Sequence, residues 1–511
     1  MRLYFSCMFI RKNKNRSGSV SIQIVQKVNR RNVIIKTIGI AQSKREEELL
    51  SLFAKQYISS HLGLQSLFVE HDDLVVENFV QQITNDHFQC VGPDLILGKI
   101  YDKIGLPNSG SCELLKHLIL CRLVSPGSKL HTVEYLRKHC NQNLSVYSIY
   151  RYLDTFDSSI QPEVETAVFN YTKSLLDGKI GVVFYDMTTL YFETSEPDDY
   201  RVPGFNKDGK HQHPQIMIGL LVSSSGFPVG YQIFEGNTAE TSTLIPVLEQ
   251  LSKRFGIEKP IVVADAALLS KTNQQALHKG GYQFILGGRL RNESQQTKHE
   301  ILKLSIQEGN PVVLQSQFGR IVIGYSPKRA KKDYHNRQKG LKRLEDKVRS
   351  GKLNKAHINN RGYNKYLKIE GTARVNIDYN LFQEDAAWDG LKGYVTNTQL
   401  EPREVIQHYS QLWQIEKAFR ISKTDLRIRP VYHRIKHRIE AHICLCFAAY
   451  AIYKELERIL KEQNVGISAE KAIEEIKQIK KLTYVLPTSR EHKDQILKPT
   501  GVQEQLLKME I

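Results

Sequence analysis

The sequence predicts an α/β fold in which a mixed sheet, flanked by helices, is split by a β-rich insertion. The first observation is the order of apolar runs in residues 177–291, which reads strand, strand, strand, helix, strand, helix, strand. The second is residues 292–400, a basic stretch with short strands, after which a helical pattern resumes in 401–460. A chain of 511 residues is long enough for several domains, at roughly 150 residues each.

The charge of the chain is basic and unevenly distributed. Lys and Arg total 72 and Asp and Glu total 54, and the resulting net charge of +18 favours an anionic partner such as nucleic acid. Residues 324–368 hold fifteen Lys and Arg against three Asp and Glu, a charge of +12. A solvated basic surface would explain this run without a partner. Its concentration favours contact with a nucleic-acid backbone, and the candidates are Lys331, Lys332, Lys342 and Arg343.

The cysteines and the apolar runs indicate the compartment. Seven cysteines, an odd number without a C-x-x-C pair, fit free thiols in a reducing cytosol better than disulfides or zinc. No uninterrupted apolar stretch approaches the ~20 residues that span a bilayer. We therefore expect a cytoplasmic protein without a membrane partner.

Two regions precede the sheet. In residues 1–42 apolar positions alternate on both sides of a polar turn, which predicts a basic antiparallel β unit. Residues 43–176 have a helical pattern with breaks at Pro107 and Pro126. Short helices with basic loops suit a DNA-binding region, although packing alone explains them about as well.

The sheet region carries two aspartates at matching places. The crossover between its first and fourth strands allows them to run parallel, and ligand sites in such sheets lie at the carboxyl ends of strands. Asp186 and Asp265 are expected at two such ends. The predicted elements are strands at 181–185, 215–222, 229–234, 261–264 and 282–286, with helices at 239–255 and 271–279.

Paired carboxylates on a rigid frame suit a divalent cation. Mg²⁺ prefers carboxylate oxygens, and two such ions can assist phosphodiester cleavage. A single aspartate at the end of a strand usually caps the next turn, but two at matching ends shift the balance towards metal. Asp186 and Asp265 are therefore candidate metal ligands.

Further elements follow the sheet region. We interpret residues 292–400 as an insertion and residues 461–511 as a C-terminal helix and polar tail. The expected elements are strands at 312–315 and 319–324, one long helix from Glu401 to about Lys423, an apolar helix at 442–456 over the remaining sheet face, and an amphipathic helix at 469–479.

The long helix places five chemically active residues at helical spacing. They are expected to share one face, with the apolar residues facing elsewhere. A solvated face with an aromatic anchor is the bland alternative, but a carboxylate, two cations and two aromatics also suit a metal, phosphates and a base. The five are Tyr409, Trp413, Glu416, Arg420 and Lys423.

This helix resembles a known family, the DDE transposases of bacterial insertion sequences. One group of that family is marked by Tyr-x2-Arg-x3-Glu-x6-Lys. Tyr409, Glu416 and Lys423 match it in register, whereas Leu412 occupies the Arg position and leaves Arg420 as a candidate for the missing charge. The wider run Tyr-x3-Trp-x-Ile-Glu-x2-Phe-Arg-x2-Lys is similar to the branch with a long strand-rich insertion. The resemblance covers roughly residues 90–460.

The resemblance implies an RNase H-like catalytic core in two parts, residues 177–291 and 401–460. It implies that Asp186, Asp265 and Glu416 are the catalytic carboxylates and bind Mg²⁺, for which Mn²⁺ can substitute. The expected activity is cutting at insertion-sequence ends and joining of the freed 3′-hydroxyl to target DNA. The expected partners are double-stranded DNA, as terminal inverted repeats and target, and a second copy of the chain in a homodimer, on the bacterial nucleoid. Tyr409, Trp413, Arg420 and Lys423 are the candidate DNA-binding residues of the helix.

Two alternatives remain at this point. A nuclease on the same core would cut without joining, and the three carboxylates do not distinguish it from a transposase. A non-catalytic DNA-binding protein derived from a transposase is the other class, against which the intact carboxylates argue. Detection of products joined to target DNA would exclude the nuclease. Detection of Mg²⁺-dependent cleavage would exclude the non-catalytic DNA-binding protein.

Overall fold

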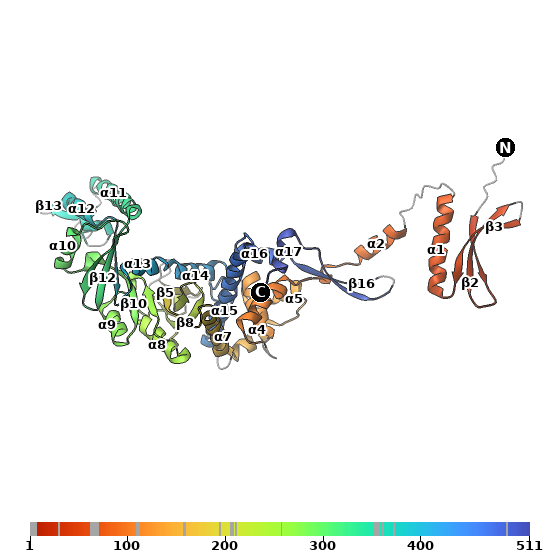
Figure 1. The fold of residues 1–511 in the computed structure, drawn as a ribbon, viewed down its shortest axis with the longest axis horizontal. Helices are drawn as coiled ribbons and strands as arrows, with labels where there is room; N and C mark the ends of the chain where they lie inside the picture. Colours follow the sequence, from red (N-terminus) through yellow and green to blue (C-terminus); the bar gives the residue numbers. More distant parts are fainter. Residues whose placement is uncertain are drawn as a thin grey trace. The chain divides into compact units, whose positions relative to one another are not determined.

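Figure 1 shows the fold of the chain in a computed structural model. The chain divides into two compact units, Met1–His87 with Tyr484–Lys493, and Phe88–Thr483 with Asp494–Ile511. The structure describes residues 8–28, 31–61, 71–108, 113–156, 160–193, 196–204, 209, 212–256, 258–350, 353, 358–359, 362–370, 374–486 and 489–511.

The smaller unit contains the antiparallel sheet expected at the start of the chain. Strand β2 pairs with β1 on one side and β3 on the other. Ile22 and Ile24 face helix α1 and form, with Ala54, a small core, because alternate residues of a strand point to the same face. Its elements are β1 (Met8–Lys14), β2 (Val20–Val28), β3 (Arg31–Ala41), α1 (Lys44–His61) and α2 (His71–Gln81).

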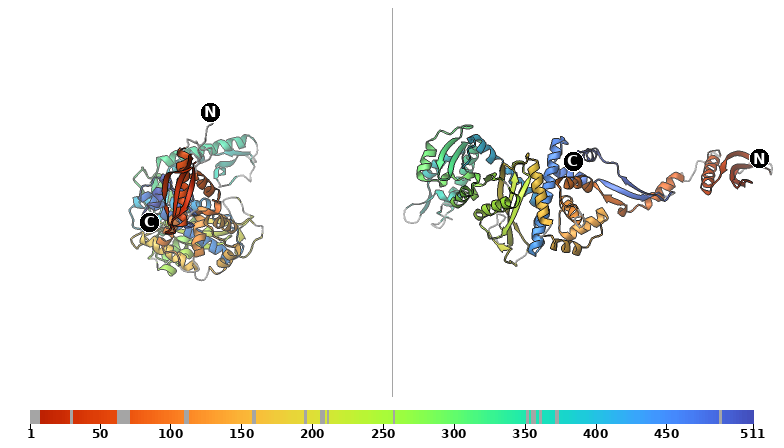
Figure 2. Two further views of the ribbon diagram at one scale, coloured as in Figure 1. Left: turned by 90° about the vertical axis from the view of Figure 1, so that its right-hand side faces the viewer. Right: turned by 60° about the horizontal axis from the view of Figure 1, so that its bottom comes forward.

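The larger unit begins with the short strand β4, and helices follow it in the region that the sequence predicts to be helical. Ser128 and Ser145 cap two of them through side-chain oxygens that accept backbone N–H groups. Four of the helices, α3, α4, α6 and α7, pack around α15 (Lys436–Glu462), which Figure 2 shows alongside α7. The elements are β4 (Phe88–Cys90), α3 (Gly98–Ile104), α4 (Glu113–Val124), α5 (Lys129–Cys140), α6 (Val146–Asp154) and α7 (Ile160–Ser174).

The five predicted strands of the central sheet are present. β5 pairs antiparallel with β7 and parallel with β9, and β9 pairs parallel with β10, which confirms the mixed sheet. With helices on both faces, this is the RNase H-like core that the resemblance implies. The elements are β5 (Val182–Tyr191), β6 (Val202–Pro203), β7 (Pro214–Ser223), β8 (Pro228–Glu235), α8 (Leu244–Phe255), β9 (Ile261–Ala264), α9 (Lys271–Lys279) and β10 (Gln283–Gly288).

The first strand does not end at Asp186, and this expectation was wrong. Its parallel pairing with β9 ends at Tyr185, opposite Ala264, but its antiparallel pairing with β7 continues to Tyr191, opposite Gln215. Asp186 therefore lies within β5, at the first position where the neighbour on one side has ended.

The insertion extends the central sheet. β15 pairs with β10, and β12 and β11 follow outward, so three inserted strands continue the ladder of the core. Most of the basic run forms the long helix α11. The elements are α10 (Gln295–Lys303), β11 (Val312–Ser316), β12 (Gly319–Tyr325), α11 (Pro327–Arg349), β13 (Leu367–Glu370), β14 (Arg374–Ile377), α12 (Tyr379–Glu384) and β15 (Leu391–Thr396).

The single helix expected from Glu401 to Lys423 is two helices, α13 (Pro402–Ser410) and α14 (Trp413–Thr424). Between them, Leu412 donates its N–H to Tyr409 and Ile415 donates to Leu412, so a tighter i to i−3 pattern interrupts the α-helix. This changes the direction of the side chains. α13 packs on β9, β10, β12 and β15, whereas α14 packs on β5 and β7.

The residues after α15 contain more secondary structure than the expected helix and polar tail. They form α16 (Ala469–Ile476), β16 (Lys480–Val485), β17 (His492–Ile496) and α17 (Gly501–Leu507). β16 pairs with β4, near the start of the larger unit.

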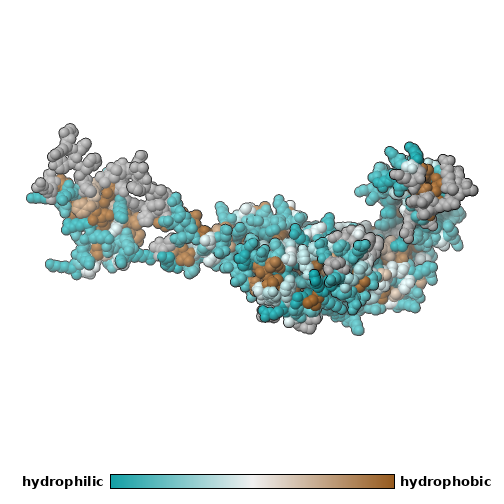
Figure 3. Space-filling model, turned by 180° about the vertical axis from the view of Figure 1, so that it is seen from behind, coloured by the Kyte–Doolittle hydropathy of each residue, from teal (hydrophilic) through white to brown (hydrophobic). Residues whose placement is uncertain are grey.

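Hydrophobic side chains are sparse on the face of the molecule that Figure 3 shows, where they occur as small scattered groups. Among the described residues, no helix is long and apolar enough to cross a membrane.

Candidate active site

Asp186 and Asp265 occupy the same register position on neighbouring strands. Tyr185 of β5 pairs with Ala264 of β9, so the next residue on each strand is one of the two aspartates. Adjacent strands lie about 4.8 Å apart. Tyr185 and Ala264 pack into the core beneath α8 and α9, and since successive side chains alternate, both aspartates point to the opposite face.

Each aspartate is oriented by local hydrogen bonds. Asp186 Oδ1 accepts the Met187 N–H at 2.7 Å. Asp265 Oδ1 accepts the Ala266 N–H at 2.6 Å and caps the short turn that follows β9. Oδ2 of Asp265 accepts no hydrogen bond from any described residue, and this side chain is exposed. The turn-capping role and a ligand-binding role are therefore compatible.

Glu416 lies on the same side of the sheet. Ile415, Ala418 and Ile421 of α14 are buried in the core that also contains Phe184 of β5, so Glu416 faces outward from the helix. It forms no hydrogen bond or ion pair with the described part of the chain.

Tyr409 lies beside the carboxyl ends of β9 and β10, and not on the exposed face of α14. Its side chain is only 6% exposed, and its hydroxyl donates to Asp265 Oδ1 at 3.3 Å. Burial, followed by the nearby Asp265 carboxylate, raises the pKa of Tyr409. A Cβ at Gly287 would lie 2.5 Å from the Tyr409 hydroxyl, so glycine at this position of β10 permits the contact. The expectation of one shared face was wrong for Tyr409, because the turn at Leu412 separates it from α14.

Lys392 of β15 joins this group, and sequence reasoning missed it. Its Nζ lies 4.4 Å from the centroid of the Tyr409 ring. Burial and the nearby Arg329 lower its pKa, whereas the negative charges of Asp265 and Glu416 act in the opposite direction. No local sequence signal marks it, because its place beside Tyr409 depends on the pairing of β15 with β10.

The donor chemistry of Asp186, Asp265 and Glu416 fits a hard divalent cation, because all three are carboxylates on one side of the sheet. Within the described ranges, no group of three or more His, Cys, Asp and Glu side chains is arranged to hold a metal ion. To hold one ion together, the three carboxylates would have to lie closer to one another than they do in this structure.

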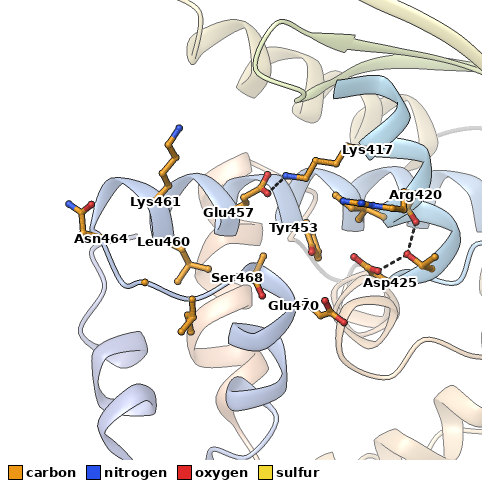
Figure 4. A pocket seen from close by; sticks show the side chains of 15 residues that line it. Lys417, Arg420, Asp425, Tyr453, Glu457, Leu460, Lys461, Asn464, Ser468 and Glu470 are labelled. Carbon is orange, nitrogen blue, oxygen red and sulfur yellow. Dashed lines mark hydrogen bonds and ion pairs between the residues drawn. The ribbon is translucent and has the colours of Figure 1, made fainter. Parts of the chain in front are cut away.

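The other candidates of α14 have separate surroundings. Trp413 is 51% exposed. Lys423 approaches β5, where it lines a small cavity with Thr188 and Phe419. Arg420 lines a larger cavity of about 760 Å³ between α14, α15 and α16, shown in Figure 4 with the ion pair of Lys417 and Glu457. Charges of both signs line this cavity.

The four basic candidates in the insertion are all exposed on α11. Lys331, Lys332, Lys342 and Arg343 lie on one side of the helix, opposite Leu344. Arg337 of the same run is buried and forms an ion pair with Asp389 at 2.5 Å, so it stabilises the insertion instead.

The mixed sheet, with two aspartates on adjacent parallel strands and a glutamate on a covering helix, is the arrangement that the transposase resemblance implies. A profile of the family described as "Transposase DDE domain" matches residues 177–452. This is more than half of the chain, which therefore belongs to that family, as the motif resemblance implied. No curated protein matches the sequence.

Comparison with solved structures gives distant similarities. The chain is 11% identical to a piggyBac transposase in a synaptic complex with hairpin DNA, with a TM-score of 0.37 over 75% of this chain and 76% of that one. It is 13% identical to a Mos1 transposase in a paired-end complex with the left transposon end, with a TM-score of 0.15 over 35% of this chain and 59% of that one. At these scores the family assignment depends on the sequence match.

Proposed function

We propose that this chain is a Mg²⁺-dependent DDE transposase that cuts the ends of an insertion sequence and joins the freed 3′-hydroxyl to target DNA. The observation that carries the proposal is the shared face of Asp186 and Asp265 on adjacent strands, with Glu416 on the helix above it. Membership of the transposase family supports the same reaction class.

The proposed roles follow from the donors. Asp186, Asp265 and Glu416 would hold the cations through carboxylate oxygens. When bound, a pair of Mg²⁺ ions supplies activation of the attacking oxygen and stabilisation of the leaving oxygen. Tyr409 positions Asp265 by its hydrogen bond. Water attacks in the cutting reaction and the 3′-hydroxyl in the joining reaction, so no side-chain nucleophile is required.

The proposed DNA contacts lie on two helices. The exposed cations of α11 lie on one side of the helix. This suits contact with a phosphate backbone, which carries no sequence information. On α14, exposed Trp413 can stack on a base, and Arg420 and Lys423 add positive charge. Two DNA ends require two active sites, which favours a homodimer as the active complex.

The test is a cleavage and joining assay on DNA that carries the inverted repeats flanking the coding region. With Mg²⁺ or Mn²⁺ and a target plasmid, we expect nicked ends followed by joined products, and neither in EDTA. Cleavage without joining would assign a nuclease, and end binding without cleavage a non-catalytic protein. Asp186→Asn and Asp265→Asn should be inactive. The matched control is Glu249→Gln, an exposed carboxylate on α8, beneath the opposite face of the sheet.

A further inference from the structure

A cavity of about 470 Å³ adjoins Asp265 on the insertion side of the site. Gly287 and Gly288, at the end of β10, line it together with Lys392 of β15 and Tyr409 of α13. A Cβ at Gly288 would lie 2.9 Å from the Gly393 carbonyl carbon, so glycine is required for the close approach of the two strands here. The volume is within the range of ligand sites.

The lining of this cavity is cationic. Arg289, Arg291, Arg329 and Lys392 contribute four positive charges, and Asp265 is the only carboxylate among the described residues that line it. Arg291 is neutralised by Asp385 at 2.9 Å, and Arg329 is paired with Asp333 at 3.4 Å. Arg289 and Lys392 form no hydrogen bond or ion pair with described residues. The uncompensated charge favours an anion.

Among the four cations, Lys392 has a side chain that aromatic rings hold in place. Its ammonium lies against the Tyr409 ring at 4.4 Å and the Tyr394 ring at 5.6 Å, so its position is set by packing. Burial lowers its pKa, which means that the charged form lacks part of the solvation it would have in water. A phosphate oxygen would supply a charge-assisted hydrogen bond that the protein does not.

We infer that this cavity is a phosphate-binding subsite for a DNA strand, in which Lys392 holds a phosphodiester beside the one that faces Asp265 and Glu416. The inference rests on the proposed function and deepens it. Because Asp265 and Lys392 line the same cavity, a phosphate held by Lys392 lies near the reacting one. Arg289 and Arg329 add attraction that offsets the repulsion between the carboxylates and the DNA strand.

The test measures binding without metal, so that it does not depend on cleavage. Fluorescence anisotropy would use the full chain and duplexes of the insertion-sequence end, each with one phosphate replaced by a neutral methylphosphonate. For the wild type we expect one position near the cleavage site to weaken binding by about 10-fold, the effect of one charged hydrogen bond. Lys392→Met should weaken binding of unmodified DNA by about the same factor. A methylphosphonate at that one position should weaken binding by Lys392→Met no further, while the other positions should behave as in the wild type.

Two variants control for folding and for general charge. Lys392→Arg keeps the cation and should respond like the wild type. Lys253→Met removes an exposed cation from α8, on the far side of the sheet, and should also respond like the wild type. Thermal melting of each variant reports whether it is folded, and an unfolded Lys392→Met would leave Lys392→Gln to carry the comparison.

Each outcome decides the inference. A Lys392→Met protein that responds to methylphosphonates at every position as the wild type does would overturn the subsite while leaving the proposed function intact. Competition by inorganic phosphate that depends on Lys392, with no methylphosphonate effect at any position, would assign the cavity to free phosphate and overturn the DNA assignment. A wild-type protein that does not bind the end at all would overturn both proposals.

Discussion

At the scale of single residues, the side chains of the site form two groups, one exposed and one fixed by packing. Asp265 combines a turn cap with an open second oxygen, and Glu416 is exposed without a described partner. Tyr409 and Lys392 are instead fixed by burial and ring packing. Exposed carboxylates therefore lie beside side chains that packing holds in place.

The first prediction separates chemistry from positioning on α14. Glu416→Gln removes a carboxylate charge that an amide cannot replace in a Mg²⁺ site, so cleavage should be abolished while end binding stays within about twofold of the wild type. Lys423→Ala should reduce binding and cleavage together. A gel shift beside a Mg²⁺ cleavage assay makes the comparison. Near-normal cutting by Glu416→Gln would remove Glu416 from the site.

Two histidines in the interior should make the larger unit sensitive to acid. His442 Nε2 lies 3.0 Å from the Ile428 carbonyl and its Nδ1 lies 3.4 Å from Arg122 Nη2. A neutral ring with its proton on Nε2 satisfies both contacts. Burial and Arg122 hold the pKa of His442 well below its usual value, and burial and Lys129 lower the pKa of His433 to about 3.

The second prediction follows from the sign of these shifts. Both histidines stay neutral in the folded chain but are protonated in the unfolded chain below about pH 6.5, so their contribution is complete above that pH and is lost as the pH falls. Each should cost about 2 kcal/mol of unfolding free energy between pH 7 and pH 5. Denaturant unfolding of His442→Gln should show a smaller loss, whereas exposed His335→Gln should match the wild type. If the unfolding free energy of His442→Gln fell with decreasing pH as steeply as that of the wild type, this account would be contradicted.

At the scale of elements, the positions of strands and helices were predicted more accurately than the place where a helix is interrupted. β9 and α9 match the expected ranges 261–264 and 271–279, because apolar alternation and the flanking polar residues are local signals. The turn at Leu412 has no proline or glycine to mark it, and it exists because α13 and α14 pack on different strands. Lys392 was missed for the same reason, since its place beside Asp265 depends on the pairing of β15 with β10.

The third prediction concerns α11 as an element. Replacing Lys331, Lys332, Lys342 and Arg343 with Ala should weaken DNA binding across sequences and flatten its salt dependence, by about one unit of slope for each lost phosphate contact. The helix should remain folded, because these side chains are exposed and alanine is the best helix former. The measurement is binding affinity at several salt concentrations.

The matched control for α11 removes the same charge elsewhere. Lys173, Lys253, Lys271 and Lys279 are exposed on α7, α8 and α9, and their replacement with Ala should leave the slope nearly unchanged. Equal slopes for the wild type and the α11 variant would show that this basic side is only a solvated surface.

At the scale of the whole molecule, the two units have separate interiors. The core of Ile22, Ile24 and Ala54 contains residues from the start of the chain only, whereas the core around α15 begins at Ile96 among the described residues. The match to the transposase family falls entirely within the larger unit. Cores that share no residue have no direct reason to melt together, so the chain should not behave as a two-state protein.

The last prediction is that calorimetry resolves two unfolding transitions that respond to different substitutions. Ile24→Val and Ile443→Val each remove one methyl group from a fully packed position, in the smaller and the larger unit respectively, at a cost of about 0.5–1.5 kcal/mol. Ile24→Val should lower only one melting temperature and Ile443→Val only the other. The smaller unit should shift further for the same loss, because a smaller domain has a smaller unfolding entropy. If either substitution moves a single common transition, the two cores are energetically coupled and the chain unfolds as one cooperative body.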